Sequence, residues 1–429
     1  MIIIVGAGLA GLTCAKQLSE AGQQVLVLEA ADQVGGRLRT DYHEDGYRLD
    51  RGFQVLFTAY PAATRHLNYE ALKQRKFDPG ALLVKNGKLR AIADPLRKPQ
   101  NALPSLLNPL VSTADKLRVL RLIGQLARLS TADIFSGKQQ PEGCDETTEA
   151  YLRRQGFSHK FIDNFVRPFY GGIFLDRSLQ TSARMFHFTF KMLASGDIIL
   201  PAEGIQCIPE QLAHALPEGT VRTNARVSEL LIDGDQVRGV QLTSGEQIEA
   251  ERVVVATSSP IAERFVKEKL PTKPMSVTCL YFAGDEQLYK ERKILLNAEP
   301  DAYVNNAVLL TNIAPTYAPP RKHLLSVSVL GEPEGDDELV AERCRTELAR
   351  WFPDANLSRW QLLAVYRIPF AQFAQPAGIF DELPDNRTNI EGLYLAGEYT
   401  RSSSIQGAMH SGEHAASEIL ESALRVPSR

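Results

Sequence analysis

The hydrophobic residues of this chain fall into short continuous runs near both ends and in one central segment. Residues 2–5 and 25–28 are such runs, and residues 12–20, between them, have a helical pattern. Similar runs occupy residues 253–255 and 393–396. Apolar runs of this length without alternation are typical of strands buried on both faces. The pattern therefore predicts an α/β fold whose central strands come from distant parts of the chain.

Alternating and helical patterns fill the regions between these runs. Residues 221–231 and 236–242 alternate like the two strands of a hairpin around Asp233 and Gly234. Further patterns predict strands at 277–282, 324–330 and 362–366, a helix at 337–351, and mainly helical structure over 100–195. We predict two discontinuous domains, one built from 1–65, 200–265 and 385–429, and an α+β substrate domain built from 66–199 and 266–384.

Charge and cysteine content narrow the class of protein. The 429 residues carry 48 basic and 51 acidic side chains, a formal net charge of −3, which disfavours nucleic-acid binding by phosphate neutralisation. Five scattered cysteines without a C-x-x-C pair are typical of a reducing compartment, so we expect a cytoplasmic protein. No apolar stretch is long enough to predict a membrane-spanning helix.

One segment departs from this near-neutral balance. Residues 85–135 contain nine basic and three acidic side chains, interleaved with leucines and isoleucines. A basic amphipathic element of this kind can lie on an anionic membrane surface, and it can equally be a core-packed helix pair with a solvated basic face. The sequence leaves both interpretations open.

A glycine-rich turn links the first strand to the first helix. It contains Gly6, Gly8, Leu9, Ala10 and Gly11, and Glu29 ends the second strand 18 residues after Gly11. In such a turn the first glycine allows the tight bend, the second lets the backbone approach a pyrophosphate, and the third lets helix pack on strand. An acid at the end of the second strand can hold ribose hydroxyls and repels a 2′-phosphate. The order predicts a Rossmann-like unit that binds a dinucleotide other than NADP.

The residues after Glu29 distinguish FAD from NAD. Ala30 is followed by Gly35, Gly36 and Arg37, a pair of glycines and a forked cation suited to phosphate oxygens. With this Gly-Gly-Arg the sequence resembles the flavin amine oxidase and phytoene desaturase superfamily, whose FAD domain is Rossmann-like and related to glutathione reductase. The resemblance implies that this segment lies along the FAD pyrophosphate and that Gly52 and Phe53 touch the flavin ring.

The C-terminal segment resembles the second FAD motif of the same superfamily. A strand-like run ends at Gly397 and Glu398, and a helix pattern begins near Ile405. The resemblance implies that FAD contacts Gly397, Glu398, Ile405, Gln406 and Ala408 here, that Val227 clasps the adenine, and that Ala256 belongs to a short turn near the cofactor. Because no cysteine lies between Gly397 and Ser404, we expect non-covalent FAD.

Within the superfamily, the sequence departs from the amine oxidase pattern at three positions, which makes an amine oxidase the less favoured interpretation. Thr278 stands where amine oxidases place a lysine, Ser404 stands where one cage aromatic would be, and the covalent-flavin cysteine is absent. Residues 397–414 are closer to carotene desaturases. The resemblance then implies hydride removal from an apolar, isoprenoid-like small molecule. Aromatic residues at 165–174 and 370–373 could wall its tunnel, although such aromatics more often pack in the core. Tyr366 and Arg367 stand near the position where relatives place an aromatic against the flavin. We assign no catalytic acid or base.

Other interpretations stay open. An amine or porphyrinogen oxidase is the alternative within the same class, and a lipid-binding protein resembling GDP-dissociation inhibitors is the alternative of another class. Without a second dinucleotide turn, we expect oxygen or a quinone as the diffusible electron acceptor. His410, Glu413 and His414 fit the H-x-x-E-H pattern of zinc peptidases, but only 15 residues follow and no third ligand is evident. We therefore expect no metal.

Overall fold

The computed structural model describes residues 1–92, 112–138 and 145–425. A five-stranded parallel sheet lies near the N-terminus in the order β10-β2-β1-β14-β20. Its strands are β1 (Ile2–Val5), β2 (Val25–Leu28), β10 (Val221–Arg222), β14 (Arg252–Val255) and β20 (Leu393–Leu395). The predicted α/β fold is confirmed, and the sheet joins three separated stretches of the chain as expected.

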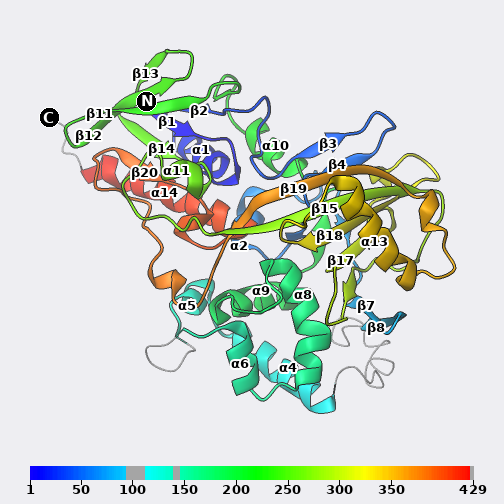
Figure 1. Ribbon diagram of the computed structural model, residues 1–429. Helices are drawn as coiled ribbons and strands as arrows, with labels where there is room; N and C mark the ends of the chain where they lie inside the picture. The colour runs from blue at the N-terminus through cyan, green and yellow to red at the C-terminus, as the bar shows by residue number, and fades with distance from the viewer. Residues whose placement is uncertain (93–111, 139–144, 426–429) are drawn as a thin grey trace.

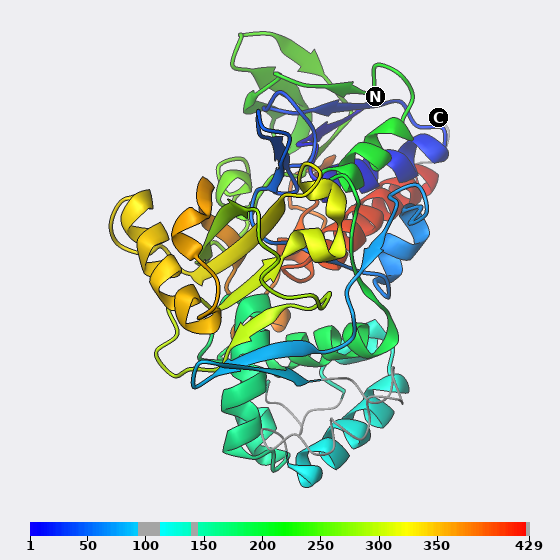
Figure 2. The ribbon, with the colours of Figure 1, turned by 90° about the vertical axis from the view of Figure 1, so that its right-hand side faces the viewer.

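Two helices from opposite ends of the chain pack side by side on this sheet. They are α1 (Leu9–Glu20) and α14 (Ile405–Arg425), shown in blue and red in Figures 1 and 2. Gly412 of α14 lies against the backbone of α1, because a Cβ there would come within 2.3 Å of the Ala10 carbonyl oxygen. The N-termini of both helices therefore reach the same region of the molecule.

The predicted hairpin is present, but its first strand is shorter than the pattern suggested. It consists of β11 (Val227–Asp233) and β12 (Gln236–Leu242), extended by β13 (Gln247–Glu249). Val221 and Arg222 belong instead to the parallel sheet, where they pair with β2. The alternating run is thus divided between two sheets at residues 223–226.

A second, seven-stranded sheet forms the other half of the molecule, in the order β19-β15-β18-β17-β16-β7-β8. Its strands are β7 (Ala81–Lys85), β8 (Lys88–Ile92), β15 (Pro274–Gly284), β16 (Leu295–Asn297), β17 (Asn306–Leu309), β18 (His323–Leu330) and β19 (Gln361–Phe373). Leu325, Val327 and Val329 face α13 (Asp337–Trp351), and the alternate residues of β18 face the interior. The three predicted strands and the predicted helix are confirmed.

A helical region lies beneath this sheet in the view of Figure 1. It comprises α4 (Thr113–Ala127), α5 (Thr131–Phe135), α6 (Thr148–Arg154), α7 (His159–Phe161), the π-helical turn η2 (Ile162–Val166), α8 (Arg167–Phe174) and α9 (Ala183–Ser195). Five of these helices begin after a serine or threonine whose side chain accepts from a backbone N–H of the first turn: Ser112, Ser130, Thr147, Ser158 and Ser182. Residues 100–111 and 139–144 of the predicted helical segment lie outside the described residues, as do Arg97 and Lys98 of the basic segment 85–135.

Short elements connect these parts: β3 (Thr40–Tyr42), β4 (Arg48–Asp50), β5 (Leu56–Phe57), β6 (Arg75–Lys76), β9 (Ile198–Leu200), α2 (Pro61–His66), α10 (Cys207–His214), α11 (Ser259–Ala262), α12 (Leu310–Ile313), η3 (Pro315–Tyr317), η4 (Leu357–Arg359), η5 (Ile379–Asp381) and η6 (Glu398–Thr400). Within the described ranges, the helices are all too short or too polar to cross a bilayer.

Candidate flavin and substrate cavity

A cavity of ≈ 710 Å³ lies between the two sheets. One end, which we call the nucleotide end, is lined by residues from the parallel sheet, the turn after β1, the start of α14 and the β10–β11 connection. The other end, which we call the inner half, is lined by α8 and by strands β15 to β19. A pocket of this volume suits a cofactor or a small molecule.

The turn after β1 presents bare backbone to the nucleotide end. Gly6 has a φ of +109°, and a Cβ at Gly8 would meet no atom within 4 Å, so Gly8 faces open space. The α-carbon of Gly8 lies 3.5 Å from where a Cβ on Gly36 would be. Gly8 is also the N-cap of α1, whose first N–H groups have no side-chain cap. Backbone N–H groups at an uncapped helix start bind phosphate well.

Gly11 does not line the cavity among the described residues. A Cβ there would come within 2.0 Å of the Gly6 carbonyl oxygen and 3.2 Å of the Ala256 side chain. Its missing side chain therefore lets α1 pack against the end of β1, which is the role that the spacing predicted.

Glu29 is held in a fixed position at the end of β2. Its Oε2 accepts from the backbone N–H of Ala7 and its Oε1 from that of Ala31, both at 2.8 Å. The carboxylate keeps further lone pairs for hydroxyl groups in the cavity.

Arg37 and Glu398 form an ion pair at the wall of the cavity, with Arg37 Nη1 2.6 Å from Glu398 Oε1. Arg37 Nη1 also donates to the Ala371 carbonyl of β19 at 2.8 Å. Glu398, which is only 7% exposed, accepts from Ser403 Oγ at 3.0 Å. The ion pair therefore links the segment after β2 to the segment after β20, and Arg37 also ties both to strand β19 of the second sheet.

The structure brings most of the predicted cofactor residues together around the cavity, although the chain separates them by up to 400 residues. Those that line it are Gly6, Gly8, Leu9, Ala10, Glu29, Ala30, Gly35, Gly36, Arg37, Gly52, Phe53, Val227, Ala256, Gly397, Glu398, Ile405 and Ala408. Gln406 does not line it, because its Oε1 accepts from the Ala62 backbone N–H at 2.8 Å and so anchors α2.

The inner half is walled by fewer aromatic side chains than the sequence suggested. Phe169 lines it, but Phe370 and Phe373 pack into the core beside the parallel sheet. Their neighbours Ile368, Pro369 and Ala371 line the cavity instead. For Phe370 and Phe373 the structure therefore supports the core interpretation over the tunnel interpretation, and this stretch of β19 reaches the cavity through Ala371 and Gln372 instead.

Tyr366 is directed toward Asp41 and is absent from the described lining. Its hydroxyl donates to Asp41 Oδ2 at 2.9 Å, and Arg51 donates to both oxygens of the same carboxylate. Burial raises the pKa of Asp41, but the hydrogen bonds from Arg51 and Tyr366 outweigh this and lower it. Arg367 lines the cavity with its stem, since its guanidinium binds Asp337 and the carbonyls of Pro333 and Gly335.

Several polar residues of the lining escaped the sequence analysis. They are Arg51, Gln54, Arg226, Thr257, Asn306, Ser328, Ser403 and Gln372. Asn306 and Ser328 belong to no motif, whereas each of the others lies within or next to a segment that was predicted to be near the cofactor or substrate but was given no role of its own. Only their strand alternation, combined with knowledge of which face is interior, would have pointed to Asn306 and Ser328.

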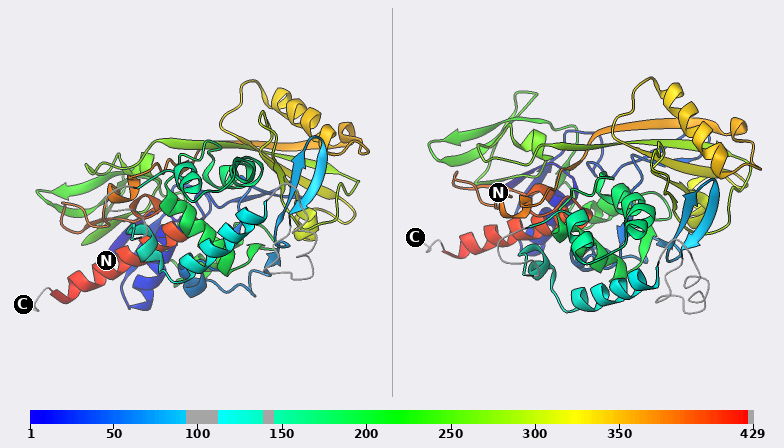
Figure 3. Two further views of the ribbon diagram at one scale, coloured as in Figure 1. Left: turned by 90° about the horizontal axis from the view of Figure 1, so that it is seen from below. Right: turned by 60° about the horizontal axis from the view of Figure 1, so that its bottom comes forward.

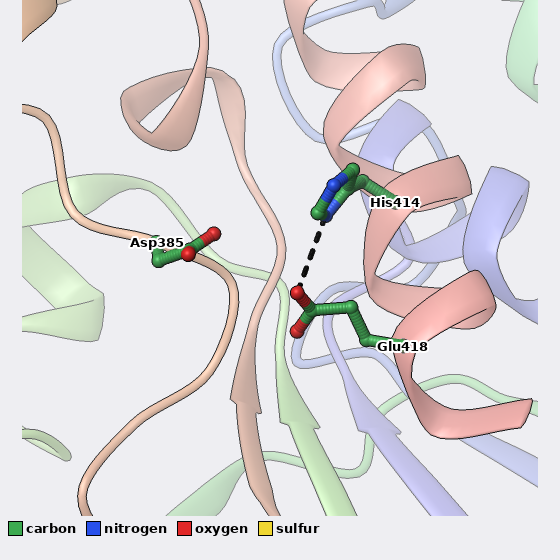
Figure 4. A group of neighbouring side chains, drawn as sticks. All are labelled: Asp385, His414 and Glu418. Carbon is green, nitrogen blue, oxygen red and sulfur yellow. Dashed lines mark ion pairs between the residues drawn. The ribbon is translucent and has the colours of Figure 1, made fainter. Parts of the chain in front are cut away.

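The H-x-x-E-H pattern on α14 does not gather its three side chains into one centre. Glu413 is engaged by Arg65 and His66, with oxygen–nitrogen distances of 2.7 and 2.8 Å. These partners lower the pKa of Glu413 to about 2 despite its burial. His414 instead lies beside Glu418 and Asp385, as Figure 4 shows, with ligand atoms within 4.8 Å of one another. Glu418 already pairs with Arg387 at 3.1 Å, so we assign no metal there.

Comparisons with known proteins agree with this arrangement. Residues 9–420 match the family of flavin containing amine oxidoreductases. The 15-cis-phytoene desaturase of Glycine max is 25% identical over 98% of this chain and 79% of its own length. That of Synechococcus elongatus is 23% identical over 98% and 95%.

Among solved structures, an oxidoreductase from Methanosarcina mazei superposes with a TM-score of 0.73 at 22% identity. It covers 98% of this chain and 99% of its own. Together, the family match over nearly the whole chain and the shared fold confirm the predicted resemblance. The chain belongs to the flavin-containing amine oxidoreductase family and is an FAD-dependent oxidoreductase of that superfamily.

Proposed function

We propose that this protein is a desaturase-like enzyme that removes hydride from an apolar small molecule. The inner half of the cavity supports this best, because its described lining is dominated by Phe169, Ile173, Val277, Leu296, Leu330 and Ile368. Apolar walls favour a substrate without charge at the reacting end. The relatives named phytoene desaturase favour an apolar, carotenoid-like substrate over other uncharged molecules.

The charges of the cavity disfavour a cationic amine. Its described lining has two carboxylates, Glu29 and Glu398, and both stand at the nucleotide end. The inner half has, within the described residues, no acid to pair with an ammonium group, and Arg367 of β19 contributes only its stem there. Burying an unpaired cation there would be costly. On β15 the cavity-facing residue is Val277, while the buried Thr278 donates to the Gly331 carbonyl.

We also propose that FAD binds non-covalently along the nucleotide end. The pyrophosphate would lie at the uncapped start of α1, near Gly8 and Gly36, and Glu29 would hold the adenosine ribose. Val227 and Ala256 would border the adenine side, and Gly52, Phe53, Ile405 and Ala408 the flavin side. When bound, the flavin supplies the two-electron acceptor of the reaction. The proposed FAD domain of residues 1–65, 200–265 and 385–429 contains every strand of the parallel sheet.

The chain's own residues then position and enclose the reactants. Gly52, with a φ of +94°, meets Ile368 so closely that a Cβ would lie 2.7 Å from Ile368 Cδ1. This contact brings the nucleotide end against β19. Substrate in the inner half would thus meet the flavin side directly, between apolar walls of the same cavity. As the diffusible electron acceptor that completes the reaction we propose oxygen or a quinone.

The test is anaerobic mixing of the purified protein with phytoene, putrescine or protoporphyrinogen. We expect a yellow protein whose absorbance near about 450 nm is bleached by phytoene alone. Bleaching by putrescine or protoporphyrinogen instead would contradict the desaturase proposal. A colourless protein that binds no added FAD would contradict the flavin site and favour a lipid-binding protein of the same fold.

A further inference from the structure

Two buried polar side chains interrupt the apolar inner half of the cavity. Asn306 of β17 and Ser328 of β18 both line it, and each is only 5% exposed. They are register partners on neighbouring strands, and Asn306 Nδ2 lies 3.3 Å from Ser328 Oγ. Buried polar groups are usually fully hydrogen-bonded within the protein or to a ligand, so what satisfies these two decides what the cavity can hold.

The direction of hydrogen bonding in this cluster is fixed by Arg177. A guanidinium can only donate, and Arg177 Nη1 donates to Asn305 Oδ1 at 3.1 Å. The Asn305 amide therefore turns its Nδ2 toward Asn306 Oδ1, at 2.9 Å, and toward the Pro168 carbonyl, at 3.2 Å. Asn306 must in turn point its own Nδ2 at Ser328 Oγ.

Ser328 stands at the end of this series of donors. Its oxygen is already accepting, so its hydroxyl hydrogen needs an acceptor, and among the described residues none lies within bonding distance of it. Asn306 Nδ2 likewise has a second hydrogen beyond the one given to Ser328. Both groups border the cavity, which therefore receives two hydrogen-bond donors from an otherwise apolar wall.

The position of this pair separates it from the flavin side. Gly52 meets Ile368 of β19, and the order of the sheet is β19-β15-β18-β17. Since neighbouring strands lie about 4.8 Å apart, Ser328 and Asn306 are roughly 10–14 Å across the sheet from that contact. Helix α8 closes the wall beside β17, as Figure 1 shows, because a Cβ on Gly172 would come within 2.8 Å of Asn305 Nδ2.

We propose that the substrate is an apolar molecule that carries a hydrogen-bond acceptor oxygen at the end remote from the reacting carbon. Ser328 and Asn306 hold this oxygen, so they are specificity-determining residues. The inference rests on the proposed function and adds to it a preference for an oxygenated substrate over a plain hydrocarbon. A site built to hydrogen-bond an oxygen binds the analogue that lacks it more weakly, because the buried donors would be left unpaired, so a plain hydrocarbon such as phytoene would still react but would bind less tightly than an oxygenated substrate.

The test compares two probes that differ only in this oxygen. They are geranylacetone, an apolar isoprenoid ketone, and the hydrocarbon in which a methylene replaces its carbonyl. Equilibrium dialysis with the FAD-loaded protein should show the ketone binding about tenfold more tightly than the hydrocarbon. Equal binding of both probes, or binding of neither, would overturn the proposal, and equal binding would mean that a water molecule satisfies the donors.

Ser328→Ala and a matched control variant test whether the preference for the ketone depends on Ser328. Ser328→Ala should reduce the preference for the ketone, because only the Asn306 amide is left to donate to its oxygen, while leaving hydrocarbon binding within about twofold. Ser326→Ala should keep the preference, since Ser326 lies on the same face of β18 but outside the described lining, with its Oγ 3.4 Å from Cys279 Sγ. Equal weakening of both probes by Ser328→Ala would also overturn the proposal.

The flavin proposal and this inference are tested by two different measurements, so that either can be contradicted without the other. Flavin content is read from the absorbance of the purified protein, and ketone preference from dialysis. A protein without flavin would contradict the first, and one with flavin but without preference would contradict the second.

Discussion

Gly8 is the residue whose missing side chain shapes the nucleotide end most directly. In Gly8→Ala the added methyl group meets no protein atom within 4 Å, and the φ of −76° suits any residue. Folding should therefore lose at most about 1 kcal/mol, the cost of alanine at an N-cap. The methyl group would project into the space proposed for the pyrophosphate. We expect at least about a tenfold loss of FAD affinity, measured by titrating the apoprotein with FAD.

Gly124→Ala is the matched control. Gly124 is an exposed helical glycine on α4, and an added Cβ there also meets no atom within 4 Å. Alanine in a helix interior should raise stability by up to about 1 kcal/mol and leave FAD affinity unchanged. Equal FAD affinity in Gly8→Ala and Gly124→Ala would show that the phosphate lies elsewhere.

Single residues also show where sequence reasoning succeeds and where it stops. Gly6, Gly8 and Glu29 were predictable because a turn that approaches backbone closely tolerates few residue types at fixed spacing. Ser328 and Asn306 were not, because a serine or asparagine in a strand carries no spacing rule. Their role follows from the Arg177 contact, which joins residues 128 positions apart.

At the level of elements, the contact of α1 with α14 determines whether the two chain ends meet. Gly412→Ala would place a Cβ within 2.3 Å of the Ala10 carbonyl oxygen and 3.1 Å of the Cys14 nitrogen. Overpacking of this kind typically costs 1–3 kcal/mol. We expect the free energy of unfolding in urea to fall by about 2 kcal/mol, and FAD affinity to fall as well, because Ala10 lines the cavity.

Gly124→Ala again serves as the control, since it adds the same methyl group to a helix without a neighbour. A Gly412→Ala protein as stable as this control would mean that α1 and α14 separate easily. The same glycine explains why the zinc-peptidase pattern misleads. Gly412 allows α14 to pack closely on α1, and Glu413 beside it binds Arg65 and His66 of helix α2.

Helices and strands were predicted correctly wherever the hydrophobic pattern of a segment reflected burial within a single element. The run of β14 is apolar because both faces are covered, and the helix α13 is amphipathic because one face covers the sheet. The prediction failed where one run served two structures, as at residues 221–231, and the sequence could not decide between core and cavity for bulky residues such as Phe370 and Phe373. Tertiary partners, which the sequence does not display, decide such cases.

At the scale of the whole molecule, Asp50 joins the two halves. It is buried and accepts from Thr40, from the Ile205 backbone N–H and from Tyr317, at 2.6 to 3.0 Å. Burial raises the pKa of Asp50 from 3.8 to about 6, against the hydrogen bonds that lower it. The folded protein therefore holds this proton more tightly than the unfolded chain does, and the associated stability is lost as the pH rises from about 4 to about 6.

Asp50→Asn should remove this dependence, because an amide of the same shape does not titrate. The rise in the pKa of Asp50 from 3.8 to about 6 corresponds to a loss of roughly 3 kcal/mol in the free energy of unfolding between pH 4 and 7. Urea unfolding of both proteins at several pH values measures the difference between them. The prediction is wrong if that difference stays constant from pH 4 to pH 7.

The outer surface of the helical region has exposed leucines beside basic side chains. Helix α4 runs along the edge of that region in Figure 3, and its Leu117 and Leu120 are 67% and 44% exposed. Lys116, Arg121 and Arg128 lie on or beside the same helix. Exposed leucines flanked by basic side chains fit an anionic lipid surface, and such a contact would let an apolar substrate enter from the bilayer.

We therefore propose that α4 docks on anionic membranes, and expect the protein to sediment with vesicles containing phosphatidylserine more than with neutral ones. Replacing Leu117 and Leu120 with glutamate should abolish this, since each removes apolar area and adds repulsion. Leu339→Glu is the control, because Leu339 is 46% exposed on α13 among acidic neighbours. Sedimentation should weaken as salt is raised, because the basic side chains act through a screened field. Equal sedimentation of wild type and the double variant would contradict the membrane proposal and would favour the alternative, in which α4 packs on the core and its basic face is solvated.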